Sequence, residues 1–233
     1  FYQNCDMVIA PSKKMKAVLK GYGIKKQVHI LPTGIDIDEA TKTDHFDPRL
    51  HFSLPAKSPL LLFVGRLGQE KNIQLLLRSM PKILARHPEA NLLIVGDGPY
   101  ANDLREIAKD LGIAGKTFFT GMLDRPKTFT CFRAADVFCF ASTTDTQGLV
   151  LNEAAIEAKP IVFIDDQISP IVRNGISGIQ AKNSTTSFAA ACNKLIEKPK
   201  LAEKYGLQAQ KLAKNITIDK QAKKLLELYK TLG

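Results

Sequence analysis

The sequence predicts an α/β fold in which a parallel β-sheet carries helices on both faces. Two observations lead to this prediction. From residue 60 onward, short apolar runs alternate with stretches of helical periodicity, and the runs are apolar at successive residues. Strands that alternate with helices pair in parallel, and strands that are covered on both faces are apolar throughout. The expected strands are 60–64, 92–95, 117–120, 136–140 and 161–164, and the expected helices are 73–87, 101–111, 125–134, 150–158 and 187–197.

A shorter strand–helix–strand unit precedes this alternation. Residues 6–11 and 28–31 are apolar enough for strands, and a basic amphipathic helix is expected over 12–22 between them. Such a helix can rest on an anionic membrane surface, or it can pack normally and expose its lysines to water. Both interpretations stay open at this point. The apolar stripe of the helix consists of Met15, Val18, Leu19 and Tyr22.

Two further segments are expected to lie outside the sheet. After a turn signal over 32–36, residues 37–58 are polar and punctuated by proline, as is typical of a linker. The tail, 195–233, is expected to form two or more basic helices. The apolar face of the last helix comprises Leu225, Leu226, Leu228, Tyr229 and Leu232.

Composition restricts the class of protein. The formal charge of +10 suits an acidic partner, but no recognition motif or aromatic-studded basic run supports nucleic acid. No apolar run is long enough to span a bilayer. The signature G-x-G-x-x-G and the P-loop are both absent, which argues against a dinucleotide dehydrogenase or a nucleoside triphosphatase. Because the chain does not begin with Met, we expect it to be part of a longer protein.

The cysteines indicate a cytosolic protein with reduced thiols. None of the four, Cys5, Cys131, Cys139 and Cys192, forms a C-x-x-C pair. The last three lie in apolar or helical stretches, so they are expected to be buried and free. A disulfide framework and a zinc site are therefore not expected.

The loops that follow the expected strands contain candidate binding residues. In parallel α/β sheets, ligands bind beyond the carboxyl ends of the strands. After the first strand, Gly65 keeps the backbone open, and Arg66 and Lys71 can reach the same anion. After the second strand, residues 96–99, Gly-Asp-Gly-Pro, form a turn.

The stretch 142–155 is organised as loop and helix after a strand. The backbone N–H groups at the start of the helix, around 147–150, lack partners and can hold a phosphate, and Gly148 lets the backbone come close. Asp145 and Glu153 lie on either side of this anion site. Because a carboxylate repels a phosphate, these two are better suited to accept hydrogen bonds from hydroxyls, as in sugars.

These residues resemble a known family. Asp145 and Glu153, with seven residues between them, resemble the Glu-x7-Glu motif of retaining glycosyltransferases of family four, although the first Glu is Asp here. Gly65, Arg66 and Lys71 are similar to the G-R-x-x-x-x-K of that family, and its G-x-G-P turn resembles residues 96–99. The sequence of residues 144–150 is most similar to the bacterial branch of the family that glucosylates diacylglycerol.

The resemblance implies a fold and a division of the chain. Residues 53–210 would form a Rossmann-like, nucleotide-sugar-binding domain, which is the C-terminal half of the two-domain GT-B fold. Residues 1–52 would be a remnant of the N-terminal domain and the linker, and 211–233 the helix that crosses back. Most of an acceptor-binding N-terminal domain would then be missing, so the chain would bind a donor without turning it over.

An activity is implied as well. It is the transfer of a hexose, glucose from UDP-glucose, to an acceptor hydroxyl with retained configuration, and in the similar branch the acceptor is diacylglycerol. No metal or other cofactor is implied. The expected location is the cytoplasm, peripheral at the inner face of the cell membrane. The alternatives are a non-catalytic nucleotide-sugar-binding module and a basic nucleic-acid-binding protein.

The resemblance also assigns roles to residues. Arg66 and Lys71 would hold the distal phosphate, Asp145 would meet the transferred sugar, and Glu153 would accept hydrogen bonds from the ribose. These four are the expected catalytic residues. Gly121, Met122 and Leu123 would hold the nucleobase. The other expected donor-binding residues are Gly65, Gln147, Gly148, Leu149 and Val150.

Overall fold

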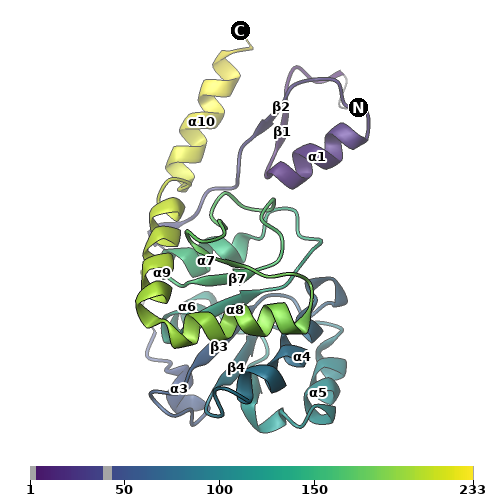
Figure 1. The fold of residues 1–233 in the computed structure, drawn as a ribbon. Helices are drawn as coiled ribbons and strands as arrows, with labels where there is room; N and C mark the ends of the chain where they lie inside the picture. Colours follow the sequence, from purple (N-terminus) through teal and green to yellow (C-terminus); the bar gives the residue numbers. More distant parts are fainter. Residues whose placement is uncertain (1–3, 39–43, 233) are drawn as a thin grey trace.

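The main domain is a single parallel sheet with helices on both sides. The computed structural model describes residues 4–38 and 44–232. The strand order is β5-β4-β3-β6-β7-β8, and every neighbouring pair is parallel (Figure 1). The predicted α/β class is therefore confirmed. The strands are β3 (Leu60–Val64), β4 (Asn91–Val95), β5 (Thr117–Phe119), β6 (Val137–Phe140), β7 (Ile161–Phe163) and β8 (Gly178–Gln180).

Helices connect the strands and continue past the last one. Those between β3 and β7, and the one after β8, begin and end close to the predicted residues. The helices are α4 (Ile73–Leu84), α5 (Ala101–Asp110), α6 (Arg125–Ala134), α7 (Leu149–Ile156), α8 (Thr185–Glu197), α9 (Pro199–Ala213) and α10 (Ile218–Lys230), with 3-10 turns η2 (Gln69–Lys71) and η3 (Ala114–Lys116).

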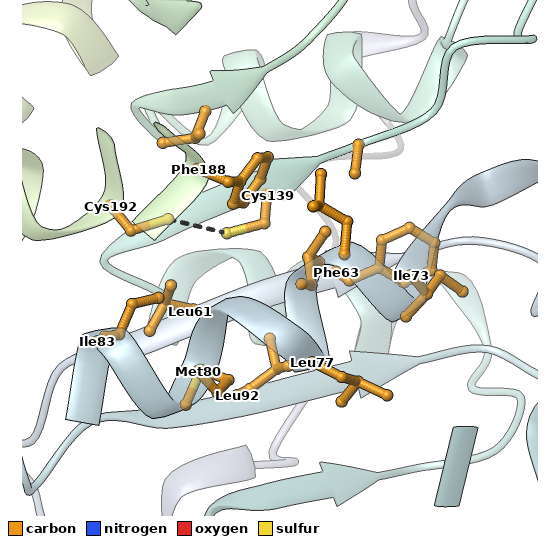
Figure 2. Packing of buried hydrophobic residues seen from close by; sticks show 14 of the residues in the cluster. Leu61, Phe63, Ile73, Leu77, Met80, Ile83, Leu92, Cys139, Phe188 and Cys192 are labelled. Atoms are coloured by element: carbon orange, nitrogen blue, oxygen red, sulfur yellow. Dashed lines mark hydrogen bonds between the residues drawn. The ribbon is translucent and has the colours of Figure 1, made fainter. Parts of the chain in front are cut away.

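Alternate residues of each strand face opposite layers of helices. In β3, Leu61 and Phe63 pack in a cluster with α4, α5 and α8, whereas Leu60 and Leu62 pack in a cluster with α6, α7 and α9. Figure 2 shows the first cluster, in which Phe188 of α8 lies over the strands. Because both faces of the sheet are buried, its strands are apolar at successive positions.

The buried thiols agree with the sequence prediction. All four cysteines are free, and Cys131, Cys139 and Cys192 are buried, whereas Cys5 is half-buried. The Sγ atoms of Cys139 and Cys192 lie 3.9 Å apart in the cluster of Figure 2.

The N-terminal residues form a separate unit, which we call the N-terminal unit. It consists of β1 (Val8–Ala10), α1 (Lys13–Gly21), β2 (Val28–Ile30) and the segment that follows β2 to Thr33, and its two parallel strands pair only with each other among the described residues. Ser12 caps α1 by accepting a hydrogen bond from the Met15 N–H. The predicted apolar stripe is shorter than expected, because Tyr22 lies at the end of α1 and is exposed. The small core of the unit is Val8, Ala10, Leu19, Ile24 and Val28.

The chain enters and leaves the sheet domain at one place. The Ile35 N–H donates to the Ile216 carbonyl at 2.8 Å, and the Ile218 N–H donates to the Ile35 carbonyl at 3.1 Å. Gly34 fits tightly beside this bridge, since a Cβ there would lie 2.4 Å from the Cα of Ile218. From this place α10 and the N-terminal unit both extend away from the same end of the sheet domain (Figure 1).

Two elements differ from the sequence predictions. The segment expected to be a linker contains a short helix, α3 (Pro48–His51), which Asp47 caps, and β8 was not expected. Helix α9 ends at Ala213, and the division of the chain after residue 210 stays a prediction. On α10 the predicted apolar face is largely exposed at Leu226, Tyr229 and Leu232. Within residues 4–38 and 44–232, no helix is long and apolar enough to cross a membrane.

Candidate functional site

The strand order reverses between β3 and β6. The chain proceeds from β3 through β4 to β5 on one side, and then returns to place β6, β7 and β8 on the other. The loops that leave β3 and β6 therefore diverge at their carboxyl ends, and such a crevice is where ligands bind in parallel α/β sheets. The two loops are residues 65–72 and 141–148, which contain half of the predicted site residues.

Lys71 and Asp145 meet across this reversal. The Lys71 Nζ lies 2.6 Å from the Asp145 Oδ1, and the side chains are only 21% and 17% exposed. The other carboxylate oxygen, Oδ2, is buried and accepts no hydrogen bond from the described residues. A buried acceptor without a donor is unfavourable unless a ligand supplies one. This oxygen can therefore accept a hydrogen bond from a bound hydroxyl.

Gly148 begins α7 directly after this loop. It adopts a left-handed conformation with φ 63°, and no side chain caps the helix. A Cβ on Gly148 would lie 2.8 Å from the Leu151 Cδ1, so a larger residue would distort the turn. The N–H groups of Leu149 and Val150 and the positive end of the helix dipole are thus available to an anion.

A cavity of about 510 Å³ joins these features. Its walls come from the ends of β3 and β6, from the start of α7 and from the N-terminal unit. A second cavity of about 700 Å³ adjoins it, because both are lined by Val64 and Gly65. The first cavity includes Lys71, Asp145, Gln147, Gly148, Leu149 and Val150 among its lining residues, and the second includes Arg66, Met122 and Leu123.

Glycine backbones shape the second cavity. The Gly96 N–H donates to the Gly121 carbonyl at 2.9 Å, which joins the loops after β4 and β5. A Cβ on Gly96 would lie 2.0 Å from the Gly65 carbonyl oxygen, so only glycine permits this approach. Met122 is 81% exposed at the rim and Leu123 is half-buried. An apolar slot with backbone polar groups suits a flat aromatic ring.

The structure does not bring Arg66 and Lys71 to one point. Arg66 is exposed, and its Nη2 lies 2.6 Å from the Glu70 Oε1. The pKa of the Glu70 carboxyl is lowered, first by a hydrogen bond from its own backbone N–H and then by the Arg66 charge. Arg66 and Lys71 line different cavities. The expectation that both reach one anion thus requires Arg66 to leave Glu70.

Glu153 is held away from both large cavities. Its Oε1 accepts a hydrogen bond from the Arg125 Nη1 at 3.0 Å, and it lines a small cavity of about 50 Å³. The sequence does not predict this partner, because Arg125 begins α6 and lies 28 positions away. Asn152 lines the same small cavity, is buried, and has an Oδ1 without a donor among the described residues.

Gln147 contacts the N-terminal unit. Its Oε1 accepts hydrogen bonds from the Thr33 N–H at 3.2 Å and from the Thr33 hydroxyl at 2.9 Å. The amide oxygen of Gln147 is therefore already hydrogen-bonded to Thr33. Gln147 also lines the first cavity. Within the described ranges, no group of three or more His, Cys, Asp or Glu side chains is placed to hold a metal ion.

Comparison with known protein families identifies the family of this chain. The sequence profile described as Glycosyl transferases group 1 matches residues 48–212, which contain the whole six-stranded sheet and both loops of the crevice. The chain belongs to this family. A second profile, Glycosyltransferase Family 4, matches residues 1–39 of this group 1 chain. The resemblance to family four drawn from the motifs is thereby confirmed.

Curated relatives of this group 1 chain are longer than it is. It is 34% identical over 167 residues to alpha-monoglucosyldiacylglycerol synthase of Streptococcus pneumoniae, which covers 70% of this chain and 38% of the relative. It is 28% identical over 234 residues to D-inositol 3-phosphate glycosyltransferase of Nocardia farcinica, which covers 96% of this chain and 52% of the relative. The chain spans about half the length of these relatives or less.

Solved structures of similar fold agree. Anabaena Alr3699/HepE in complex with UDP and glucose superposes with a TM-score of 0.85 at 21% identity, covering 97% of this chain and 64% of that one. Sucrose-phosphate synthase from Thermosynechococcus elongatus gives a TM-score of 0.84 at 24% identity, covering 99% and 59%. At these identities the likeness shows the fold, and it confirms the predicted fold class.

Proposed function

We propose that this chain binds the donor of a retaining glycosyltransferase and presents a hexose, glucose from UDP-glucose, for transfer to an acceptor hydroxyl. One observation carries the proposal. At the strand reversal, the Lys71–Asp145 pair leaves one buried carboxylate oxygen without a donor, directly beside the uncapped start of α7. A cation, an acceptor and a helix N-terminus in one cavity suit a sugar attached to a diphosphate.

Each part of the donor has a place in the crevice. The nucleobase occupies the apolar slot between Gly65, Met122 and Leu123. The diphosphate lies at Lys71 and the N–H groups after Gly148, and the sugar reaches Asp145. Glu153 exchanges its contact with Arg125 for the ribose hydroxyls. Fixed positive charge then stabilises the departing diphosphate without reorganisation, so the proposal assigns the reaction no metal or other cofactor.

The proposed acceptor is diacylglycerol at a membrane surface. The name alpha-monoglucosyldiacylglycerol synthase is carried by relatives from both Streptococcus pneumoniae and Acholeplasma laidlawii, and these names support this acceptor. The lysines of α1 suit the anionic inner face of a cell membrane, to which a cytoplasmic enzyme would attach peripherally. In a two-domain glycosyltransferase the residues that bind the acceptor belong to the N-terminal domain. We therefore propose that this 233-residue chain alone binds the donor without transferring the sugar.

Calorimetric titration tests the proposal. UDP, UDP-glucose, uridine and duplex DNA are titrated into the chain at two salt concentrations. We expect UDP and UDP-glucose to bind more tightly than uridine, because only they reach Lys71 and the start of α7. Tighter binding of DNA with a steep dependence on salt would overturn the proposal. A parallel assay for glucose transfer to diacylglycerol in vesicles is expected to stay at background.

A further inference from the structure

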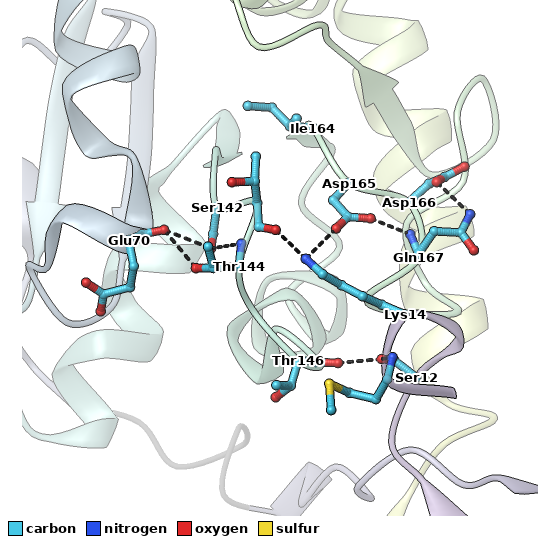
Figure 3. A network of polar contacts seen from close by, with 12 residues as sticks. Ser12, Lys14, Glu70, Ser142, Thr144, Thr146, Ile164, Asp165, Asp166 and Gln167 are labelled. Carbon is cyan, nitrogen blue, oxygen red and sulfur yellow. Dashed lines mark hydrogen bonds and ion pairs between the residues drawn. The ribbon is translucent and has the colours of Figure 1, made fainter. Parts of the chain in front are cut away.

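The loop that contains Asp145 is fixed by distant parts of the chain. We call residues 142–147 the sugar loop. Each of its six residues makes a polar contact with a residue that lies at least 72 positions away in the sequence. Figure 3 shows the contacts made by Glu70, Lys14 and Ser12, which reach the loop from two sides. A short loop held at every residue has little freedom to move.

The first side is the loop after β3. The Glu70 carbonyl accepts hydrogen bonds from the hydroxyls of Ser142 at 3.3 Å and Thr144 at 3.1 Å (Figure 3). Next to it, Lys71 pairs with Asp145. All of these partners belong to the sheet domain, so they stay with the sugar loop whatever the N-terminal unit does.

The second side is the N-terminal unit. The Lys14 ammonium donates to the Thr143 carbonyl, and the Ser12 hydroxyl donates to the Thr146 carbonyl (Figure 3). Thr33 completes this side through Gln147. Lys14 contacts the backbone carbonyl two residues before Asp145, and Ser12 contacts the carbonyl one residue after it, so together they fix the path of the chain on both sides of that residue.

Lys14 also ties the sugar loop to the loop after β7. Its Nζ lies 2.8 Å from the Asp165 Oδ2, with side chains only 23% and 18% exposed. Its backbone N–H donates to the Gln167 carbonyl at 3.1 Å, and the Gln167 N–H donates to the Asp165 Oδ1 at 2.9 Å. An ion pair that is mostly shielded from water is weakened little by salt. Lys14 thus joins three segments: α1, the sugar loop and the loop after β7.

We propose that Lys14, assisted by Ser12, is a positioning residue that holds the sugar loop in the shape in which Asp145 meets the transferred hexose. The inference rests on the proposed function, because it takes Asp145 to be the sugar contact. Lys14 does not line the 510 Å³ cavity, so it acts through the loop and not on the donor. The N-terminal unit therefore influences selection of the donor sugar from outside the sheet domain.

Binding of UDP and UDP-glucose to Lys14→Met tests this inference. Methionine keeps most of the length of the side chain but removes the charge and the donors. We expect UDP-glucose to bind about tenfold more weakly, equivalent to about 1.4 kcal/mol, while UDP binds as in the unaltered chain. Lys14→Arg keeps a charged donor and is expected to restore most of the affinity. Lys20→Ala, an exposed lysine on the same helix, is the matched control and should change neither ligand.

Hydrogen exchange in the free chain provides a second readout that needs no ligand. Peptides covering the sugar loop should exchange faster in Lys14→Met than in Lys20→Ala, with the strands of the sheet unchanged. If Lys14→Met weakens UDP and UDP-glucose equally, or neither, the inference is overturned while the proposed function stands. If the unaltered chain binds neither ligand, the proposed function fails, and unchanged exchange in the sugar loop overturns the positioning role separately.

Discussion

Lys71 Nζ and Asp145 Oδ1 lie 2.6 Å apart across the line where the strand order reverses. Lys71 ends the turn η2 after β3, and Asp145 lies in the loop after β6. The pair satisfies only one carboxylate oxygen, because Oδ2 has no donor within the described ranges. Lys71 neutralises a carboxylate beside the proposed diphosphate site, so the charge that the donor meets there depends on both residues.

The first prediction concerns Lys71 and Arg66. Lys71→Ala is expected to weaken UDP and UDP-glucose by about 1.5–3 kcal/mol, since a charged hydrogen bond to phosphate is lost, and to leave uridine unchanged. Arg66→Ala should act in the same direction but less, because Arg66 is exposed and must first leave Glu70. Calorimetry with Lys82→Ala, an exposed lysine on α4, as control measures these losses. An equal loss for uridine would show that Lys71 supports the fold instead.

The second prediction separates the two carboxylates. Asp145→Ala should weaken UDP-glucose but leave UDP intact or slightly tighter, because a negative charge near the diphosphate is removed. Glu153→Ala should weaken both ligands together, because both contain the ribose. The ratio of the two dissociation constants, measured for each variant, distinguishes these outcomes. If Asp145→Ala reduced the two affinities equally, the assignment of Asp145 to the sugar would be wrong.

The third prediction concerns the thiols. Burial raises the pKa of Cys131 to about 12 and the pKa of Cys192 well above its ordinary value, so both stay protonated and unreactive near neutral pH. Cys139 is buried beside Cys192, and only Cys5 is partly accessible. Iodoacetamide at pH 8 should therefore modify one cysteine of the folded chain and four of the unfolded chain, as counted by mass spectrometry. Rapid modification of Cys131 in the folded chain would contradict this packing.

The fourth prediction concerns the pH dependence of stability. Burial raises the pKa of Glu157, although Arg133, with its Nη2 3.2 Å from the Glu157 Oε1, opposes the shift. The folded chain then holds this proton more tightly than the unfolded chain, so the contribution is present below the unfolded pKa and is lost as pH rises through the folded pKa. Glu157→Gln cannot titrate. The unfolding free energy of the unaltered chain should therefore fall relative to Glu157→Gln between pH 4 and pH 7.

Urea denaturation at each pH measures this difference. Glu227→Gln, on the exposed part of α10, controls for the removal of one negative charge. An unfolding free energy of the unaltered chain that rose relative to that of Glu157→Gln as pH increased would have the opposite sign and would refute the prediction.

The alternation of apolar runs with helical stretches was sufficient to predict the sheet. Each central strand is covered on both faces, so its residues are apolar at successive positions. Strand β8 escaped prediction because Gly178, Ile179 and Gln180 contain one large apolar residue and no alternation. Helix α3 is a single turn, yet its cap Asp47 and its first residue Pro48 are both ordinary signals for a helix start. Proline had been interpreted there only as a sign of a linker.

The sequence predicted which loops form the site, but it did not predict which side chains in those loops pair with one another. Loops that follow parallel strands lie at the same edge of the sheet, so Lys71 and Asp145 were expected at one edge. The pairing of Glu153 with Arg125, and of Arg66 with Glu70, depends on side-chain directions that no sequence spacing gives. Contacts from Ser12 and Lys14 to the sugar loop were beyond prediction, because they join segments more than a hundred positions apart.

The bridge that joins Ile35 to Ile216 and Ile218 has a practical consequence for protein engineering. Everything between these residues leaves and returns within the spacing of two paired strands, which is about 4.8 Å. A segment with adjacent ends can be inserted into a surface loop of an unrelated host protein without separating the two ends of that loop. The sheet domain therefore meets the geometric condition for insertion into such a host, because its two ends lie side by side.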